Sequence, residues 1–146
     1  MEQINQTSEN PKKIKLDFKN SKYATGRRKK SIAKVWVKKG SGNIHVNGLK
    51  MNAYFKRPVH QIIVTRPLEI SEVATSYDVK CSVKGGGLSG QAGAIILGIS
   101  KALISHDENL KKNLKKDKLT TRDSRVVERK KYGHRKARRS FQFSKR

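Results

Sequence analysis

The residues most suggestive of chemistry form a glycine-rich turn, Gly85-Gly86-Gly87-Leu88-Ser89-Gly90, which satisfies the G-x-G-x-x-G pattern of dinucleotide-binding sites. A predicted strand precedes this turn and a predicted helix follows it, as such a site requires. Asp107 and Glu108 follow at about 20 residues, the spacing of a ribose-binding acid. That acid belongs at the end of the next strand, however, whereas these two start a lysine-rich helix. We therefore expect no nucleotide cofactor.

Two other interpretations of the glycine turn stay open. Its glycines, Gly85, Gly86, Gly87 and Gly90, could form a tight turn at which the backbone approaches closely and the helix packs against the sheet. Alternatively, the N–H groups at the start of the helix could donate hydrogen bonds to an RNA phosphate.

The remaining reactive side chains form no pattern typical of an active site or a metal site. The single cysteine, Cys81, lies between Val79 and Val83 on an apolar stripe, so we expect a buried and inert thiol. The four histidines lack ligand spacing, and the 11 acids show no pairing suited to general acid–base catalysis. The sequence therefore predicts a protein that is not an enzyme and takes no metal or cofactor.

Basic residues form two clusters instead. Thr25-Gly26-Arg27-Arg28-Lys29-Lys30 places four consecutive cations beside a glycine that lets the backbone come close to a ligand. Residues 130–146 contain eight basic and no acidic residues. Because Lys and Arg neutralise phosphates and release counterions, binding through these clusters should weaken steeply with salt.

Four aromatic side chains lie close to basic residues in the sequence and could stack on unpaired bases. Trp36 lies between two lysines of a predicted strand, so base stacking and partial burial in the sheet are equally open. Tyr132, Phe141 and Phe143 lie in the C-terminal cluster, where docking onto protein is the open alternative to stacking.

The net charge of +24 over 146 residues indicates a polyanionic partner, and it is unevenly distributed. The middle of the chain, 41–108, is nearly neutral, with seven basic and five acidic residues. The segment before it, 21–40, has eight basic and no acidic residues, and the segment after it, 109–146, has 16 basic and three acidic residues. No apolar run approaches the roughly 18 residues of a membrane span, and one cysteine excludes a disulfide framework. Without a zinc finger, helix-turn-helix or heptads, folded RNA is a better partner than a specific DNA duplex.

The nearly neutral middle of the chain should supply the strands and helices. Alternating apolar residues predict half-buried strands over 31–38, 43–46 and 77–84, and Asn47-Gly48 predicts a hairpin turn. A helix over 58–66 should begin at its proline and end before the next one, at position 67. Its apolar face is predicted at Val59, Ile62 and Ile63.

A longer helix should follow the glycine turn, because the apolar residues there form one continuous stripe, at Leu88, Ala92, Ile95, Ile96, Ile99 and Leu103. Three glycines in this helix each cost about 1 kcal/mol relative to alanine, which indicates close approach of the sheet or of a partner. Two weaker helices should begin at capping boxes, Ser105 with Glu108 and Thr120 with Asp123.

These patterns divide the chain into four segments. We expect a disordered or extended N-terminal extension over 1–20 and a globular α+β domain over 21–108. A basic helical segment over 109–131 and an extended RNA-binding tail over 132–146 should follow.

Four motifs in this order identify a family. They read YATGRRKKS (23–31), VKGGGLSGQAGA (83–94), TRDSRVVERKKYG (121–133) and RKARRSFQFSKR (135–146). Together they resemble the family of small-ribosomal-subunit protein nine, in its bacterial or organellar branch, and the resemblance covers roughly 21–146.

The resemblance implies a two-layer α+β fold in which a mixed four-stranded sheet carries helices on one face. It also implies a left-handed crossover, as in the second domain of ribosomal protein S-five, and a long basic C-terminal tail. It further implies a structural constituent of the small-subunit head, bound to ribosomal RNA and to neighbouring head proteins. The tail should reach the peptidyl site, where Lys145 and Arg146 occupy the tRNA-contacting positions.

The cations of the matching motifs are the candidate ribosomal-RNA-binding residues: Arg27, Arg28, Lys29, Lys30, Arg122, Arg125, Arg129, Lys130, Lys131, Arg135, Lys136, Arg138 and Arg139. A free nucleic-acid-binding protein or RNA chaperone is the alternative function, which shares the charge but not the ordered motifs. We expect a ribosome of the bacterial cytoplasm, the mitochondrial matrix or a plastid, with no membrane and no small-molecule substrate as partner. The start of the chain resembles neither a secretory signal nor an import presequence.

Overall fold

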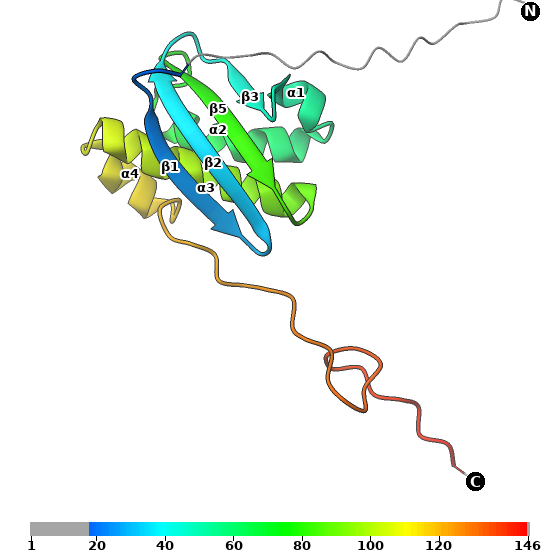
Figure 1. The fold of residues 1–146 in the computed structure, drawn as a ribbon. Coiled ribbons are helices and arrows are strands. Elements are labelled where there is room, and N and C mark those ends of the chain that lie inside the picture. Colours follow the sequence, from blue (N-terminus) through cyan, green and yellow to red (C-terminus); the bar gives the residue numbers. More distant parts are fainter. Residues whose placement is uncertain (1–17, 146) are drawn as a thin grey trace, which may run out of the picture.

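Five strands form one mixed sheet in the computed structural model, which describes residues 18–145 (Figure 1). In chain order they are β1 (Lys22–Arg28), β2 (Ser31–Lys39), β3 (Ile44–Val46), β4 (Leu49–Lys50) and β5 (Tyr77–Lys84). Their order in the sheet is β1-β2-β5-β3-β4, and every neighbouring pair is antiparallel except β3 and β5. The predicted α+β class is confirmed and is compatible with the second domain of ribosomal protein S-five. The sheet has one strand more than the four expected.

The helices cover one face of this sheet (Figure 1). Helices α1 (Met51–Tyr54) and α2 (Pro58–Ile70) belong to the crossover between β3 and β5, and α3 (Leu88–His106) and α4 (Leu110–Lys116) follow β5. The core lies between the layers, where the inward residues of β2 and β5 meet α3. As the alternation predicted, Val35 on β2 and Val79 and Cys81 on β5 are buried.

The backbones of β1 and α3 approach each other closely. A Cβ added to Gly26 would meet the carbonyl oxygen of Ala94 and lie 2.6 Å from the backbone nitrogen of Gly98. A Cβ added to Gly98 would lie 2.5 Å from Cγ2 of Val35. The glycines of α3 are therefore explained by the approach of the sheet, the first of the two reasons expected from the sequence.

The predictions for α2 are wrong in two respects. The helix continues through Pro67 to Ile70, because burial of Pro67 and Leu68 against the core outweighs the lost hydrogen bond of the proline. Its buried residues are His60, Val64, Pro67 and Leu68, whereas Val59 and Ile62 are exposed. Val59 and Ile62 therefore point to solvent, whereas Ile63 is partly buried and packs against the core as expected. The residues that face the core most fully form a longer i, i+4, i+8 stripe.

The two predicted capping boxes are also wrong. Ser105 lies in the last turn of α3, where its hydroxyl donates to the carbonyl oxygen of Lys101 over 3.0 Å. No helix forms over 120–131, so the basic segment over 109–131 is helical only in α4. Val126 and Val127 are exposed, and a short helix that buries no apolar face is marginal in water.

From residue 117 to 145 the chain has no helix or strand and leaves the domain as a long basic tail (Figure 1). Most of the predicted N-terminal extension, residues 1–17, and the terminal Arg146 lie outside the described residues.

Helix α3 corrects one further expectation. Its 19 residues are long and apolar enough to cross a membrane, although no such segment was expected from the sequence. However, 61% of its most apolar window is buried inside the domain, and a core helix meets the same criteria.

Candidate nucleic-acid interface

The first cluster of cations lies on the hairpin of β1 and β2. Arg28 is paired with Ser31, so Lys29 and Lys30 form a two-residue turn, and both are exposed. Because side chains alternate along a strand, Arg27 points to the open face of the sheet and Arg28 points toward α3. Four consecutive cations in the sequence are thus distributed over two faces and the tip of one hairpin.

The glycine turn packs against the beginning of β2. Gly85 and Gly86 have φ values of +77° and +61°, in the left-handed region that favours glycine. A Cβ on Gly86 would meet the hydroxyl of Ser31, and one on Gly90 would lie 2.8 Å from it. The same hydroxyl donates to the carbonyl oxygen of Gly85 over 3.0 Å. This geometry is that of a tight turn at which helix and sheet approach closely.

A dinucleotide does not fit this turn. Helix α3 has 19 residues and is about 28 Å long at 1.5 Å per residue, so Asp107 at its far end cannot reach a ribose bound at the turn. Asp107 instead accepts a hydrogen bond from the backbone N–H of Asn109 over 3.0 Å. In the part of the chain that is described, no strand follows α3 to supply another acid.

The single thiol is placed where it cannot act on a substrate. Cys81 is buried as expected, and burial raises the pKa of its thiol well above the ordinary value. Among residues 18–145, no group of three or more His, Cys, Asp and Glu side chains could hold a metal ion.

The hairpin tip and the glycine turn lie together. Lys29, Lys30, Gly86 and Gly87 line a cavity of about 390 Å³ with two valines of the tail, Val126 and Val127. Helix α3 begins at this point with no side-chain cap and no acid in its first turn. The positive end of the helix dipole and two lysines therefore face the same space, which favours an anion such as a phosphate.

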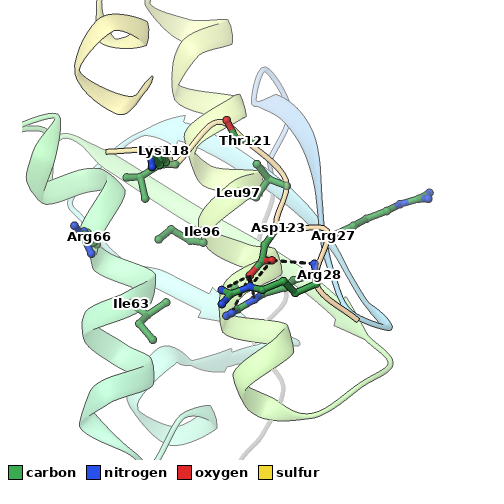
Figure 2. A pocket seen from close by; sticks show the side chains of 12 residues that line it. Arg27, Arg28, Ile63, Arg66, Ile96, Leu97, Lys118, Thr121 and Asp123 are labelled. Carbon is green, nitrogen blue, oxygen red and sulfur yellow. Dashed lines mark hydrogen bonds and ion pairs between the residues drawn. The ribbon is translucent and has the colours of Figure 1, made fainter. Parts of the chain in front are cut away.

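The base of the tail is held to the domain by Asp123 (Figure 2). Its carboxylate lies 3.1 Å from Nη2 of Arg28 and 2.9 Å from Nη2 of Arg125. It also accepts a hydrogen bond from the backbone N–H of Arg125 over 3.0 Å. Hydrogen bonds from the Arg125 guanidinium and backbone hold the pKa of Asp123 well below its ordinary value. Arg28 and Arg125, both predicted to bind RNA, thus have a structural partner here.

A second cavity, of about 370 Å³, lies beside this ion pair (Figure 2). β1, α2, α3 and the base of the tail line it. The apolar members are Ile63, Ile96, Leu97 and Leu119, and the cationic ones are Arg28, Arg66, Lys118 and Arg125. Arg27 also lines the cavity, but its side chain points away from it (Figure 2). Its one acid, Asp123, is already paired with two arginines. An apolar floor with a cationic rim suits the sugar and phosphate of a nucleotide chain. Sequence reasoning missed Arg66 and Lys118, because only the tertiary fold brings α2 beside the tail.

The rest of the tail presents its cations to solvent. Glu128 pairs with Nε of Arg138 over 2.9 Å and with Nζ of Lys131 over 3.4 Å, which closes a loop in the tail. The guanidinium of Arg135 lies 5.3 Å from the ring centre of Phe141. The other predicted cations of the described tail are exposed and make no ion pair there: Arg122, Arg129, Lys130, Lys136, Arg139 and Lys145.

Comparison with known families gives a match over most of the chain. A family profile described as "Ribosomal protein S9/S16" matches residues 26–146 of the 146-residue chain. The matched region contains the hairpin tip, the glycine turn, α3 and the whole basic tail. Members of this family are structural proteins of the small ribosomal subunit that bind ribosomal RNA and associate with other ribosomal proteins. The chain, with its cationic hairpin and basic tail on a small α+β domain, belongs to the ribosomal protein S9/S16 family.

Proposed function

We propose that this ribosomal protein lies in the head of the small subunit, in a ribosome of bacterial or organellar type. Its domain and the proximal tail bind ribosomal RNA beside neighbouring head proteins. The end of its tail contacts the tRNA in the peptidyl site through Lys145 and Arg146. The protein performs no catalysis and acts by binding and positioning RNA.

The distribution of acids along the tail carries this proposal. After residue 116 the chain has three acids, Asp117, Asp123 and Glu128, and none beyond residue 128. Each of the three is paired with a cation, Asp117 with Arg66 over 3.8 Å. Asp117 and Asp123 thus hold the base of the tail to the domain, Glu128 closes a loop within the tail, and the excess charge increases toward its end. Such a tail suits a proximal segment fixed on the domain and a distal segment bound to phosphates.

The reach of the distal segment is consistent with a contact far from the domain. Seven residues separate Arg139 from Arg146, and an extended chain spans about 3.3 Å per residue, which gives roughly 23 Å. Lys145 and Arg146 can therefore meet a ligand well beyond the RNA that holds the domain.

The test is to replace both terminal cations, Lys145→Ala with Arg146→Ala, in purified small subunits that carry the variant protein. Incorporation into subunits should be unchanged, and the affinity for tRNA in the peptidyl site should fall. The slope of log K against log salt should decrease by about 1.4–1.8 for two lost phosphate contacts. The matched control, Lys111→Ala with Lys112→Ala, removes the same charge from exposed positions on α4 and should leave tRNA binding unchanged.

Two results would contradict the proposal. Equal tRNA affinity and equal salt slopes for the terminal variant and the parent would refute the tRNA contact. Sedimentation of the parent chain mostly outside the small-subunit peak, at moderate salt, would favour the alternative of a free RNA chaperone.

A further inference from the structure

The face of the sheet opposite the helices carries a pattern unusual for an exposed surface. In Figure 1 the described helices lie behind this face of β1, β2 and β5. The ring centre of Phe18, which precedes β1, lies 5.8 Å from Nζ of Lys80 on this face. Its side chains are the alternate residues that do not enter the core: Tyr23, Thr25, Arg27, Ile32, Lys34, Trp36, Lys38, Asp78, Lys80, Ser82 and Lys84. A solvated face of an antiparallel sheet is normally polar, so two large rings here require a reason.

The two rings form one aromatic surface. Tyr23 and Trp36 are directly opposite each other on β1 and β2, with ring centres 5.3 Å apart and planes inclined by 43°. Tyr23 is 49% exposed, and Trp36 is partly exposed beside it. On the other side of Trp36, Nζ of Lys80 lies 5.9 Å from the ring centre. The rings thus have an accessible side on the surface instead of contributing to the core.

The charge around the rings is almost entirely positive. Lys34 and Lys38 are exposed on either side of Trp36, about 7 Å along the strand, and Arg27 and Lys84 are exposed near one end of the face. The one acid on the outward side of these three strands is Asp78. Burial by itself would raise the pKa of Asp78, but hydrogen bonds from the backbone N–H groups of Asn43 and Ser41 lower it overall. Asp78 is thus engaged by the adjoining loop, and its charge is directed there.

We propose that this open face is a further binding site for unpaired RNA, in which a base stacks on the Tyr23–Trp36 pair and Lys34 and Lys38 hold the flanking phosphates. The site is separate from the hairpin tip and the tail, although it rests on the proposed RNA-binding function. The cations alone would suit any polyanion. The rings favour a single strand, because only an unpaired base exposes a face for stacking, whereas a duplex presents phosphates and groove edges.

Trp36 is the single tryptophan of the chain, so its fluorescence reports on this face alone. The experiment adds short oligouridylate to the full chain and measures binding by anisotropy of a labelled oligomer and stacking by Trp36 emission. We expect saturable quenching with the single strand and little with a duplex of equal length. In a parallel experiment, bromouridine in the oligomer should photocrosslink to Tyr23 or Trp36.

Variants of this face are compared with a control on α4. Tyr23→Ala should weaken the binding followed by Trp36 emission by about 5-fold or more, the least expected for one lost stacking contact. Lys34→Ala with Lys38→Ala should weaken it while keeping both rings, which guards against a folding defect in the first variant. Lys111→Ala with Lys112→Ala, which removes the same charge from exposed positions on α4, should leave the titration unchanged.

The outcomes distinguish this site from the proposed function. If the oligomer binds without quenching Trp36 and crosslinks only to the tail, the sheet-face site is refuted while RNA binding stands. If the oligomer does not bind at all, the RNA-binding function itself fails. If an oligoglutamate peptide of equal charge quenches Trp36 as strongly as RNA, the face is a site for acidic protein segments, and the proposal is overturned.

Discussion

The substitution Gly26→Ala tests the packing that positions the cationic hairpin. β1 lies at the edge of the sheet, paired with β2 on one side and packed on α3, so the hairpin tip depends on this contact. The new methyl group would meet the carbonyl oxygen of Ala94 and lie 2.6 Å from the nitrogen of Gly98. Both are backbone atoms of a helix interior, so neither can rotate away as a side chain could.

The size of the effect follows from two opposed contributions. Overpacking of a well-packed contact costs up to about 3 kcal/mol, and a clash with helix backbone belongs at that end of the range. Replacing glycine also restricts the unfolded chain and returns about 0.5–1 kcal/mol. The net loss in free energy of unfolding is about 2–2.5 kcal/mol. For a domain of this size the melting temperature should fall by roughly 8–20 °C.

Thermal unfolding of the full chain, followed by circular dichroism, measures this shift. Gly87→Ala is the matched control, because a Cβ at Gly87 would have no atom within 4 Å and its φ of −111° suits alanine. Alanine is less favourable than glycine at the N-cap position of a helix, which lowers the stability of the folded state. Alanine also restricts the unfolded chain, which raises the stability, so the free energy of unfolding should change by no more than about 0.5 kcal/mol. If Gly26→Ala melts within a few degrees of the parent, β1 and α3 do not pack as closely as described, and the reasoning fails.

Three further predictions concern single side chains. Asp123→Ala should leave the melting temperature of the domain within a few degrees of the parent. It should speed hydrogen exchange at the backbone amide of Arg125, because that amide donates a hydrogen bond to Asp123. An unchanged exchange rate would contradict the role of this carboxylate. The pKa of Asp78 is lowered from 3.8 by folding, so the stability that it contributes is complete above about pH 4 and lost below it. The difference in melting temperature between the parent and Asp78→Asn should therefore shrink on acidification. A difference that grows would contradict the predicted loss of stability at low pH. Cys81 should resist a thiol reagent in the native protein and react promptly in denaturant, because its thiol is buried and its pKa is raised.

The parts of the fold that could be predicted from the sequence are those whose pattern is local and complete. β5 alternates over its whole length, and its buried residues Tyr77, Val79, Cys81 and Val83 are the ones expected. The errors occur where tertiary contacts outweigh local preference. Pro67 stays inside α2 because its ring is buried, and Val126 and Val127 form no helix because they bury no apolar face.

β1 was missed for a related reason. Its inward positions include Gly26 and Arg28 instead of large apolar residues, so the alternation that identifies a strand is weak. Both are explained by α3: Gly26 gives room for the helix backbone, and Arg28 passes Gly93 of α3 to reach Asp123. Where a strand packs this closely against the backbone of a helix, its content of aliphatic residues does not identify it as a strand.

The candidate site could be predicted as a set of cations but not as an arrangement. The motifs supplied the residues of the hairpin, the glycine turn and the tail, and all of these lie in the region that the family profile matches, 26–146. That Lys29 and Lys30 lie beside Gly86 and Gly87 depends on β2 pairing with β5, residues some 50 positions apart in the chain. No local signal in the sequence could have placed Arg66 in the same cavity as Arg125.

The run from Arg27 to Lys30 should therefore not be treated as four interchangeable positive charges. Strand alternation sends Arg27 to the open face and Arg28 to Asp123, and the turn places Lys29 and Lys30 beside the start of α3. Because phosphate contacts fix position and register, equal losses of charge at these positions should affect different contacts with RNA. Loss of Arg27 should act on the sheet face, loss of Lys29 and Lys30 on the hairpin tip, and loss of Arg28 on the origin of the tail. One two-residue turn thus joins three surfaces, and a rigid domain can fix the directions from which RNA approaches each of them.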